Sequence, residues 1–172
     1  MVDRIARWQP DPGAAVTARA VAAVALVALA VIHVVDLPGT LDPIPLVGIG
    51  YLGIIVSAVL VGGVLIAWPH WLAWAAAAAV AVSAMGGYVL TRALPGGFLD
   101  DHGDVGNWRC PLGIAALSVE SVVILLVLLA VLGAWQARIH AASAAATQIF
   151  HPPGEPHAST KRISSRRLSS RR

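Results

Sequence analysis

Hydrophobic residues in this chain gather in four long runs instead of alternating with polar ones. The runs cover residues 18–35, 47–68, 71–90 and 112–135, each end placed to within a few residues. A helix rises about 1.5 Å per residue, so roughly 20 apolar residues cross the ~30 Å hydrocarbon core of a bilayer. Runs of this length are typical of membrane spans. The pattern therefore predicts an all-α fold, a membrane-embedded four-helix bundle.

Proline, glycine and charged residues separate the runs. We expect a cluster of such residues to end the first helix and form a loop: Asp36, Pro38, Gly39, Asp42, Pro43 and Pro45. Pro69 and His70 leave room for only a very short turn, so the second and third helices must be antiparallel neighbours. Pro111 stands where a first helical turn tolerates a missing N–H.

Composition supports the membrane assignment. The chain is 58% hydrophobic and 12% charged, whereas a soluble domain carries about 25% charged residues. The single cysteine, Cys110, excludes an internal disulfide, a cysteine-rich metal site and a two-cysteine redox cycle within one chain.

Lysine and arginine are concentrated near the two ends of the chain and predict its direction in the membrane. Arg4, Arg7 and Arg19 stand at the first span, and seven basic residues follow the last, beginning with Arg138. Cytoplasmic flanks carry such an excess. We therefore expect a multi-pass plasma membrane protein with residues 1–17 and 136–172 in the cytoplasm and both longer loops outside. No small-x-small cleavage site directly follows the first span, so we expect it to be retained.

The segment 136–172 reads as a basic, largely disordered tail. Its proline-rich stretch 151–156 cannot continue a helix. Six basic residues then favour contact with anionic lipid, at about 1 kcal/mol each: Lys161, Arg162, Arg166, Arg167, Arg171 and Arg172. Phosphorylation of the intervening serines could release the tail. The alternative is a plain orientation signal, and no nucleic-acid partner is expected.

Polar residues lie in the half of the spans that we place outward. Glu120 lies about eight residues into the fourth run, roughly 12 Å below its outer start. Inserting a charged side chain into the hydrocarbon core costs about 2.5–3.5 kcal/mol, so an acid at this depth is a functional candidate. His33 and Asp36 share a helix face. We predict a polar pocket that opens outward above Glu120, formed by Glu120, His33, Asp36, Arg92, Tyr88 and Ser57. The alternative is structural, with Glu120 paired to Arg92 or His33.

The second outer loop concentrates carboxylates and an imidazole. Asp100, Asp101, His102 and Asp104 could bind Ca²⁺ or Mg²⁺ through oxygen, or a transition metal through the histidine. The spacing does not match an EF-hand loop, and a solvated turn is the alternative. No cofactor is expected: haem between helices would require a second histidine at the depth of His33, and His70 lies at the opposite membrane face.

The segment from Tyr88 to Glu120 resembles small four-span integral membrane proteins of actinobacteria, a family without an established activity. The matching residues are Arg92, Leu94-Pro95-Gly96, Asp100-Asp101, Gly106-Asn107-Trp108, Pro111-Leu112-Gly113, Ser118 and Glu120. The resemblance implies the four-span architecture and no particular chemistry.

Three functions are compatible with these patterns. A non-catalytic accessory or regulatory bundle ranks first, because no nucleophile–base motif, phosphate loop or zinc-ligand spacing occurs. A small transporter or channel for protons, cations or a small solute, using Glu120, is the alternative, and a membrane enzyme ranks last. Membrane lipids are the expected partners. A second copy of the chain or another membrane protein is a further possibility, because pairs of small residues four apart permit close helix packing. Gly53 and Ser57 form one such pair, and Ala58 and Gly62 form another.

Overall fold

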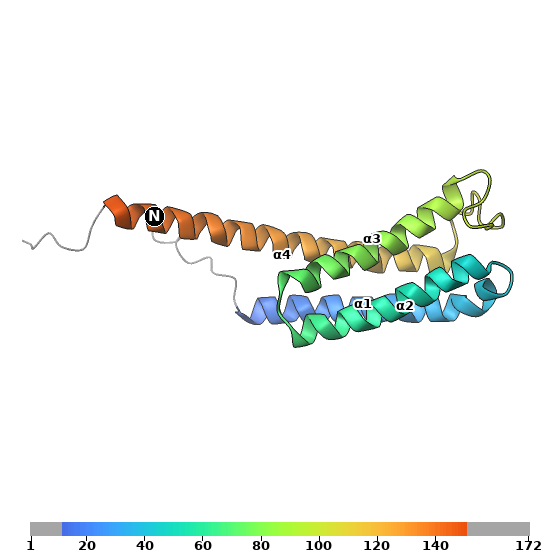
Figure 1. The fold of residues 1–172 in the computed structure, drawn as a ribbon, viewed down its shortest axis with the longest axis horizontal. Helices are drawn as coiled ribbons and strands as arrows, with labels where there is room; N and C mark the ends of the chain where they lie inside the picture. Colours follow the sequence, from blue (N-terminus) through green and yellow to red (C-terminus); the bar gives the residue numbers. More distant parts are fainter. Residues whose placement is uncertain (1–11, 151–172) are drawn as a thin grey trace, which may run out of the picture. The chain divides into compact units, whose positions relative to one another are not determined.

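A computed structural model describes residues 12–150, and this part of the chain consists of four helices (Figure 1). They are α1 Pro12–Leu41, α2 Pro45–Ala67, α3 Trp71–Ala93 and α4 Pro111–Phe150, and the described part of the chain has no β-strand. All four are long and apolar enough to cross a membrane. The predicted all-α four-helix bundle is thus confirmed. Arg4 and Arg7, as well as the basic cluster from Lys161 onward, lie outside the described residues.

α1 continues past its expected end. Pro38 lies inside the helix, so the prediction that Asp36 to Gly39 form a loop is wrong. A proline there removes one N–H donor, but the turn keeps other bonds. The Thr40 hydroxyl donates to the Asp36 carbonyl at 3.0 Å, and the Ile44 N–H donates to the Thr40 carbonyl at 3.0 Å. The link to α2 is consequently short.

α4 also extends beyond its predicted end at residue 135. Residues 136–150 are helical, so the expected disorder of the tail does not begin at 136. This stretch is rich in alanine, the best helix former, and contains neither glycine nor proline before Pro152. By its contacts the chain divides into two units at the same point, between Trp135 and Gln136. The first of these units contains the bundle described below.

The link between α2 and α3 is as short as the sequence predicts. α2 ends at Ala67 and α3 begins at Trp71, which makes them antiparallel neighbours (Figure 1). The Leu72 N–H donates to Nδ1 of His70 at 3.2 Å and so caps α3. This backbone donor would otherwise have no partner at the helix start.

Alanine supplies much of the interior of the bundle, and most of the large apolar side chains face outward. Ala22, Ala58, Ala77 and Ala81 are fully buried among Leu26, Leu29, Leu65 and Val123. An ideal Cβ on Gly62 would lie 3.6 Å from the Ala23 carbonyl, so the Ala58–Gly62 pair packs α2 against α1 inside the bundle. By contrast, Val24 and Leu60 are 69% and 64% exposed. Small residues at contacts and bulky ones outside suit packing in lipid.

Candidate functional site

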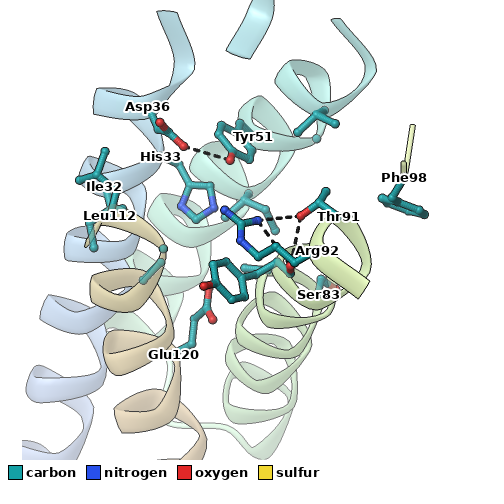
Figure 2. A pocket seen from close by; sticks show the side chains of 18 of the residues that line it. Ile32, His33, Asp36, Tyr51, Ser83, Thr91, Arg92, Phe98, Leu112 and Glu120 are labelled. Carbon is teal, nitrogen blue, oxygen red and sulfur yellow. Dashed lines mark hydrogen bonds between the residues drawn. The ribbon is translucent and has the colours of Figure 1, made fainter. Parts of the chain in front are cut away.

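A cavity of about 280 Å³ lies between the helices at the end of the bundle that carries the 94–110 loop (Figure 2). All four helices and the loop contribute to its wall. Five of the six residues predicted for a polar pocket line it: His33, Asp36, Tyr88, Arg92 and Glu120. Ser57 does not line it, because the neighbouring Ala58 takes the inward-facing position and is fully buried.

Other lining residues were not among the six predicted for the polar pocket. Tyr51 shares a wall with Val47, Gly50 and Ile54, and Phe98 and Leu99 reach the cavity from the loop. Spacings of three and four along α2 are the pattern of one helix face and could have identified Tyr51. A loop has no comparable periodic signal, and only the apolar character of Phe98 and Leu99 suggests that the loop folds back onto the bundle.

Tyr51, Asp36 and His33 form a cluster at the mouth between α1 and α2 (Figure 2). The Tyr51 hydroxyl donates to Oδ2 of Asp36 at 3.0 Å. Nδ1 of His33 lies 2.9 Å from the Leu29 carbonyl, which can only accept, so the hydrogen is on Nδ1. The His33 and Tyr51 rings meet edge to face, with centroids 4.8 Å apart. These bonds fix the side chains of α1 and α2 against each other.

Arg92 joins the end of α3 to the loop that follows it. One guanidinium nitrogen lies 3.0 Å from Oδ2 of Asp104, and Nε donates to the Asn107 carbonyl at 3.0 Å. A second nitrogen donates to the Thr91 hydroxyl at 2.7 Å, and the guanidinium lies 3.8 Å from the centre of the Tyr88 ring. The positive charge of Arg92 is therefore already compensated by Asp104.

The loop itself turns back onto the bundle. Leu99 and Asp100 have φ of 55° and 67°, a left-handed conformation that costs roughly 1–2 kcal/mol for such residues. This tight turn places Phe98 opposite Asp101 and both Phe98 and Leu99 at the cavity wall. The Tyr88 hydroxyl also donates to the Trp108 carbonyl at 3.1 Å. The edge of the cavity beside the loop thus depends on the path of the loop.

The predicted metal site in this loop is not formed. No group of three His, Cys, Asp or Glu side chains within the described residues is arranged to hold a metal ion. Asp104 instead binds Arg92 and accepts from the Asn107 amide at 3.3 Å. Oδ1 of Asp101 accepts from the Asp104 N–H at 3.2 Å. The carboxylates of Asp101 and Asp104 are thus engaged in holding the turn, and Asp100, Asp101, His102 and Asp104 do not gather into a metal-ion site.

Burial raises the pKa of Asp101, and the negative charge of Asp104 raises it further. A raised folded-state pKa means that stability is greatest below the unfolded pKa and falls as pH rises through the folded one. Asp101→Asn keeps the Oδ1 acceptor and removes the charge. We expect it to raise the free energy of unfolding at pH 7 by about 1 kcal/mol or less, and with it the melting temperature. The difference should vanish below about pH 4. Thermal unfolding at both pH values measures this, and a lower melting temperature at pH 7 would contradict it.

Glu120 is buried at the floor of the cavity. Its side chain is 1% exposed, it lines the cavity, and its Oε2 has no hydrogen-bond partner. Figure 2 shows the carboxyl group directed toward the space below Arg92 and His33. Neither of the partners expected from the sequence is bound to it: Arg92 pairs with Asp104, and His33 bonds to Leu29. The alternative in which Glu120 is held by one of these two is therefore wrong.

Comparisons of the chain with protein-family models, curated proteins and solved structures found no match. The resemblance of the 88–120 segment to small actinobacterial membrane proteins stays a prediction.

Proposed function

We propose that this chain is a non-catalytic integral membrane protein that binds a small ligand in the cavity above Glu120. The observation that carries the proposal is the Glu120 carboxyl group, buried inside a span with Oε2 unpartnered and directed into an open space. More than nine in ten buried polar groups have a partner, and an exception requires an explanation. A ligand that supplies the missing partner is such an explanation.

The size of the cavity limits the ligand. A volume of about 280 Å³ lies near the lower end of the ~300–1,000 Å³ usual for ligand pockets. The wall is largely apolar, with Ile32, Ile54, Leu112 and Ala116 between the few polar groups. This combination of an apolar wall and a few convergent polar groups is typical of a binding site.

Binding without catalysis is favoured by how the nearby hydroxyl groups are used. Ser118 and Ser121 flank Glu120 in the sequence, but both donate to backbone carbonyls of their own helix, at 2.8 and 2.7 Å. A serine nucleophile would need a base within hydrogen-bond reach. We therefore propose a receptor-like or accessory role over an enzymatic one.

The charge distribution along the chain supports an orientation for the site. Arginine and lysine flank the spans at the chain ends, so both termini belong in the cytoplasm of a plasma membrane protein. The 94–110 loop and the cavity beside it would then face the outside. The ligand would enter from the external medium.

Transport is a second candidate, favoured by a second cavity at the other end of the bundle. This cavity, about 640 Å³, is lined by α1, α3 and α4, with Arg19 and His70 among its residues. Along these helices, buried apolar side chains separate the depth of the first cavity from that of the second: Leu26, Ala77 and Val123. On α4 only the turns from Glu120 to Leu126 separate them, about 9 Å of helix. An outer and an inner cavity with an apolar layer between them suit movement of a solute.

A pair of glycines on α3 allows a matched test of the binding site. Gly87 lines the cavity and Gly86 does not, and an ideal Cβ on either would meet nothing within 4 Å. Gly87→Leu should therefore fill the cavity without a clash, while Gly86→Leu serves as its control. The full-length proteins in lipid nanodiscs would be titrated with 2-phenylethylamine, 3-phenylpropionate and 2-phenylethanol. Calorimetry would measure the affinity for each probe, and the shift in melting temperature would give an independent measure of binding.

We expect at least one probe to bind both the wild type and Gly86→Leu. The affinity of Gly87→Leu for that probe should be at least tenfold lower, a loss of about 1.4 kcal/mol in binding free energy. Equal binding by Gly87→Leu, or no binding of any probe to the wild type, would contradict the proposal. Entry of the bound probe into proteoliposomes would favour transport, and binding without entry would favour the accessory role.

A further inference from the structure

We propose that the cavity binds a small organic cation, an ammonium group on an apolar body, with Glu120 as its counter-ion. This inference rests on the proposed function and adds the chemical class of the ligand. It comes from the charges around the cavity, the chemistry of its wall and the unmet bonding capacity of Glu120.

The charges that face the cavity leave an excess of negative groups. Its ionisable wall residues other than tyrosine are His33 and Asp36 of α1, Arg92 of α3 and Glu120 of α4. Arg92 is neutralised by Asp104 at 3.0 Å. The side-chain carboxylate of Asp36 accepts only the uncharged hydroxyl of Tyr51. Two carboxyl groups thus face the space without a cation of their own, so an anionic ligand would be repelled and a cationic one attracted.

Glu120 can offer a cation a strong bond. A hydrogen bond between charged partners is roughly twice as strong as one between neutral partners. It is also strengthened where water is excluded, and the Glu120 side chain is 1% exposed. A neutral alcohol could donate to the same oxygen, but without the charge. The ammonium ligand is therefore the one that gains most from this position.

The wall argues against a bare metal ion. Ca²⁺ and Mg²⁺ need six or more oxygen ligands, and no described group of three metal-binding side chains exists here. The cavity instead offers aliphatic surface from Ile32, Ile54 and Leu112 and an aromatic ring from Phe98. Such a wall matches an apolar body attached to the cationic head.

Three probes with similar skeletons and different heads test the class directly. For the full-length wild type in nanodiscs, 2-phenylethylamine should bind at least tenfold more tightly than 2-phenylethanol, and 3-phenylpropionate should bind most weakly. Glu120→Gln keeps the size of the side chain and removes its charge, so it should lose at least tenfold in amine affinity while the affinity for the alcohol changes little. Asp42→Asn, which removes a carboxylate outside the cavity, should leave the ranking unchanged.

The outcomes separate this inference from the proposed function. If the alcohol or the acid binds the wild type as tightly as the amine, and Gly87→Leu abolishes that binding, the cavity is a binding site but the cationic class is wrong. If none of the three probes binds, the proposed function fails as well. Gel filtration shows whether Glu120→Gln folds. If it does not, Glu120→Asp, which keeps the charge, takes its place. The ranking of the three probes on the wild type and on Glu120→Asp then decides whether the cavity prefers a cation.

Discussion

Arg92→Met should lower the free energy of unfolding by about 3 kcal/mol. Removing one partner of a buried ion pair costs about 3–5 kcal/mol, and the lower end applies because the Asp104 side chain is 31% exposed and can reach water. The substitution also removes the donor to the Asn107 carbonyl and the contact with the Tyr88 ring. The loop should then detach from the end of α3.

Two measurements check this prediction. Thermal or denaturant unfolding in detergent gives the change in stability, and hydrogen exchange should show loss of protection at Gly106, whose N–H donates to the Arg92 carbonyl at 3.0 Å. Arg109→Met is the matched control, since it removes an exposed arginine of the same loop and should change stability by less than about 0.5 kcal/mol. Equal effects of the two substitutions would show that Arg92 does not hold the loop.

Glu120→Met should raise the stability of the ligand-free protein by about 2 kcal/mol. Burying a polar group without a hydrogen bond costs roughly 1–3 kcal/mol in proteins, and Oε2 of Glu120 has no partner. Methionine has similar length and no such cost. The same substitution should abolish binding of the cationic probe, because the counter-ion is gone.

Leu128→Met controls for the introduction of methionine into α4, since Leu128 is 53% exposed on the outer surface of the bundle. Melting temperatures of the two variants without ligand give the comparison. A loss of stability in Glu120→Met would mean that the carboxyl group holds the helices together, and the binding proposal would lose its main support. A gain in stability with a loss of binding is the usual signature of a residue kept for function.

These two residues divide the polar end of the bundle into two parts. Arg92 has its charge and several of its donors engaged with the loop and with α3, so its role is to position the cavity wall. Glu120 is buried to a similar degree but has an acceptor left over. This contrast, and not the polarity of the region as a whole, singles out Glu120 as the ligand-binding group.

The sequence by itself determined the presence of the four helices, the approximate limits of α2 and α3, and the short turn at Pro69. It could do so because the length of an apolar run and the position of a proline are local properties. It also placed five of the six proposed pocket residues at the same depth, since depth follows from counting along a helix.

Only the tertiary structure decided which side chains pair. Glu120, Arg92 and Asp104 were all visible in the sequence, but the turn at Leu99 and Asp100 brings Asp104, not Glu120, to Arg92. The rotation of α2 likewise buries Ala58 and keeps Ser57 out of the cavity. Pairing depends on helix rotation and on the path of a loop, which arise from packing across the whole bundle. The unpartnered oxygen of Glu120 is a consequence of that packing.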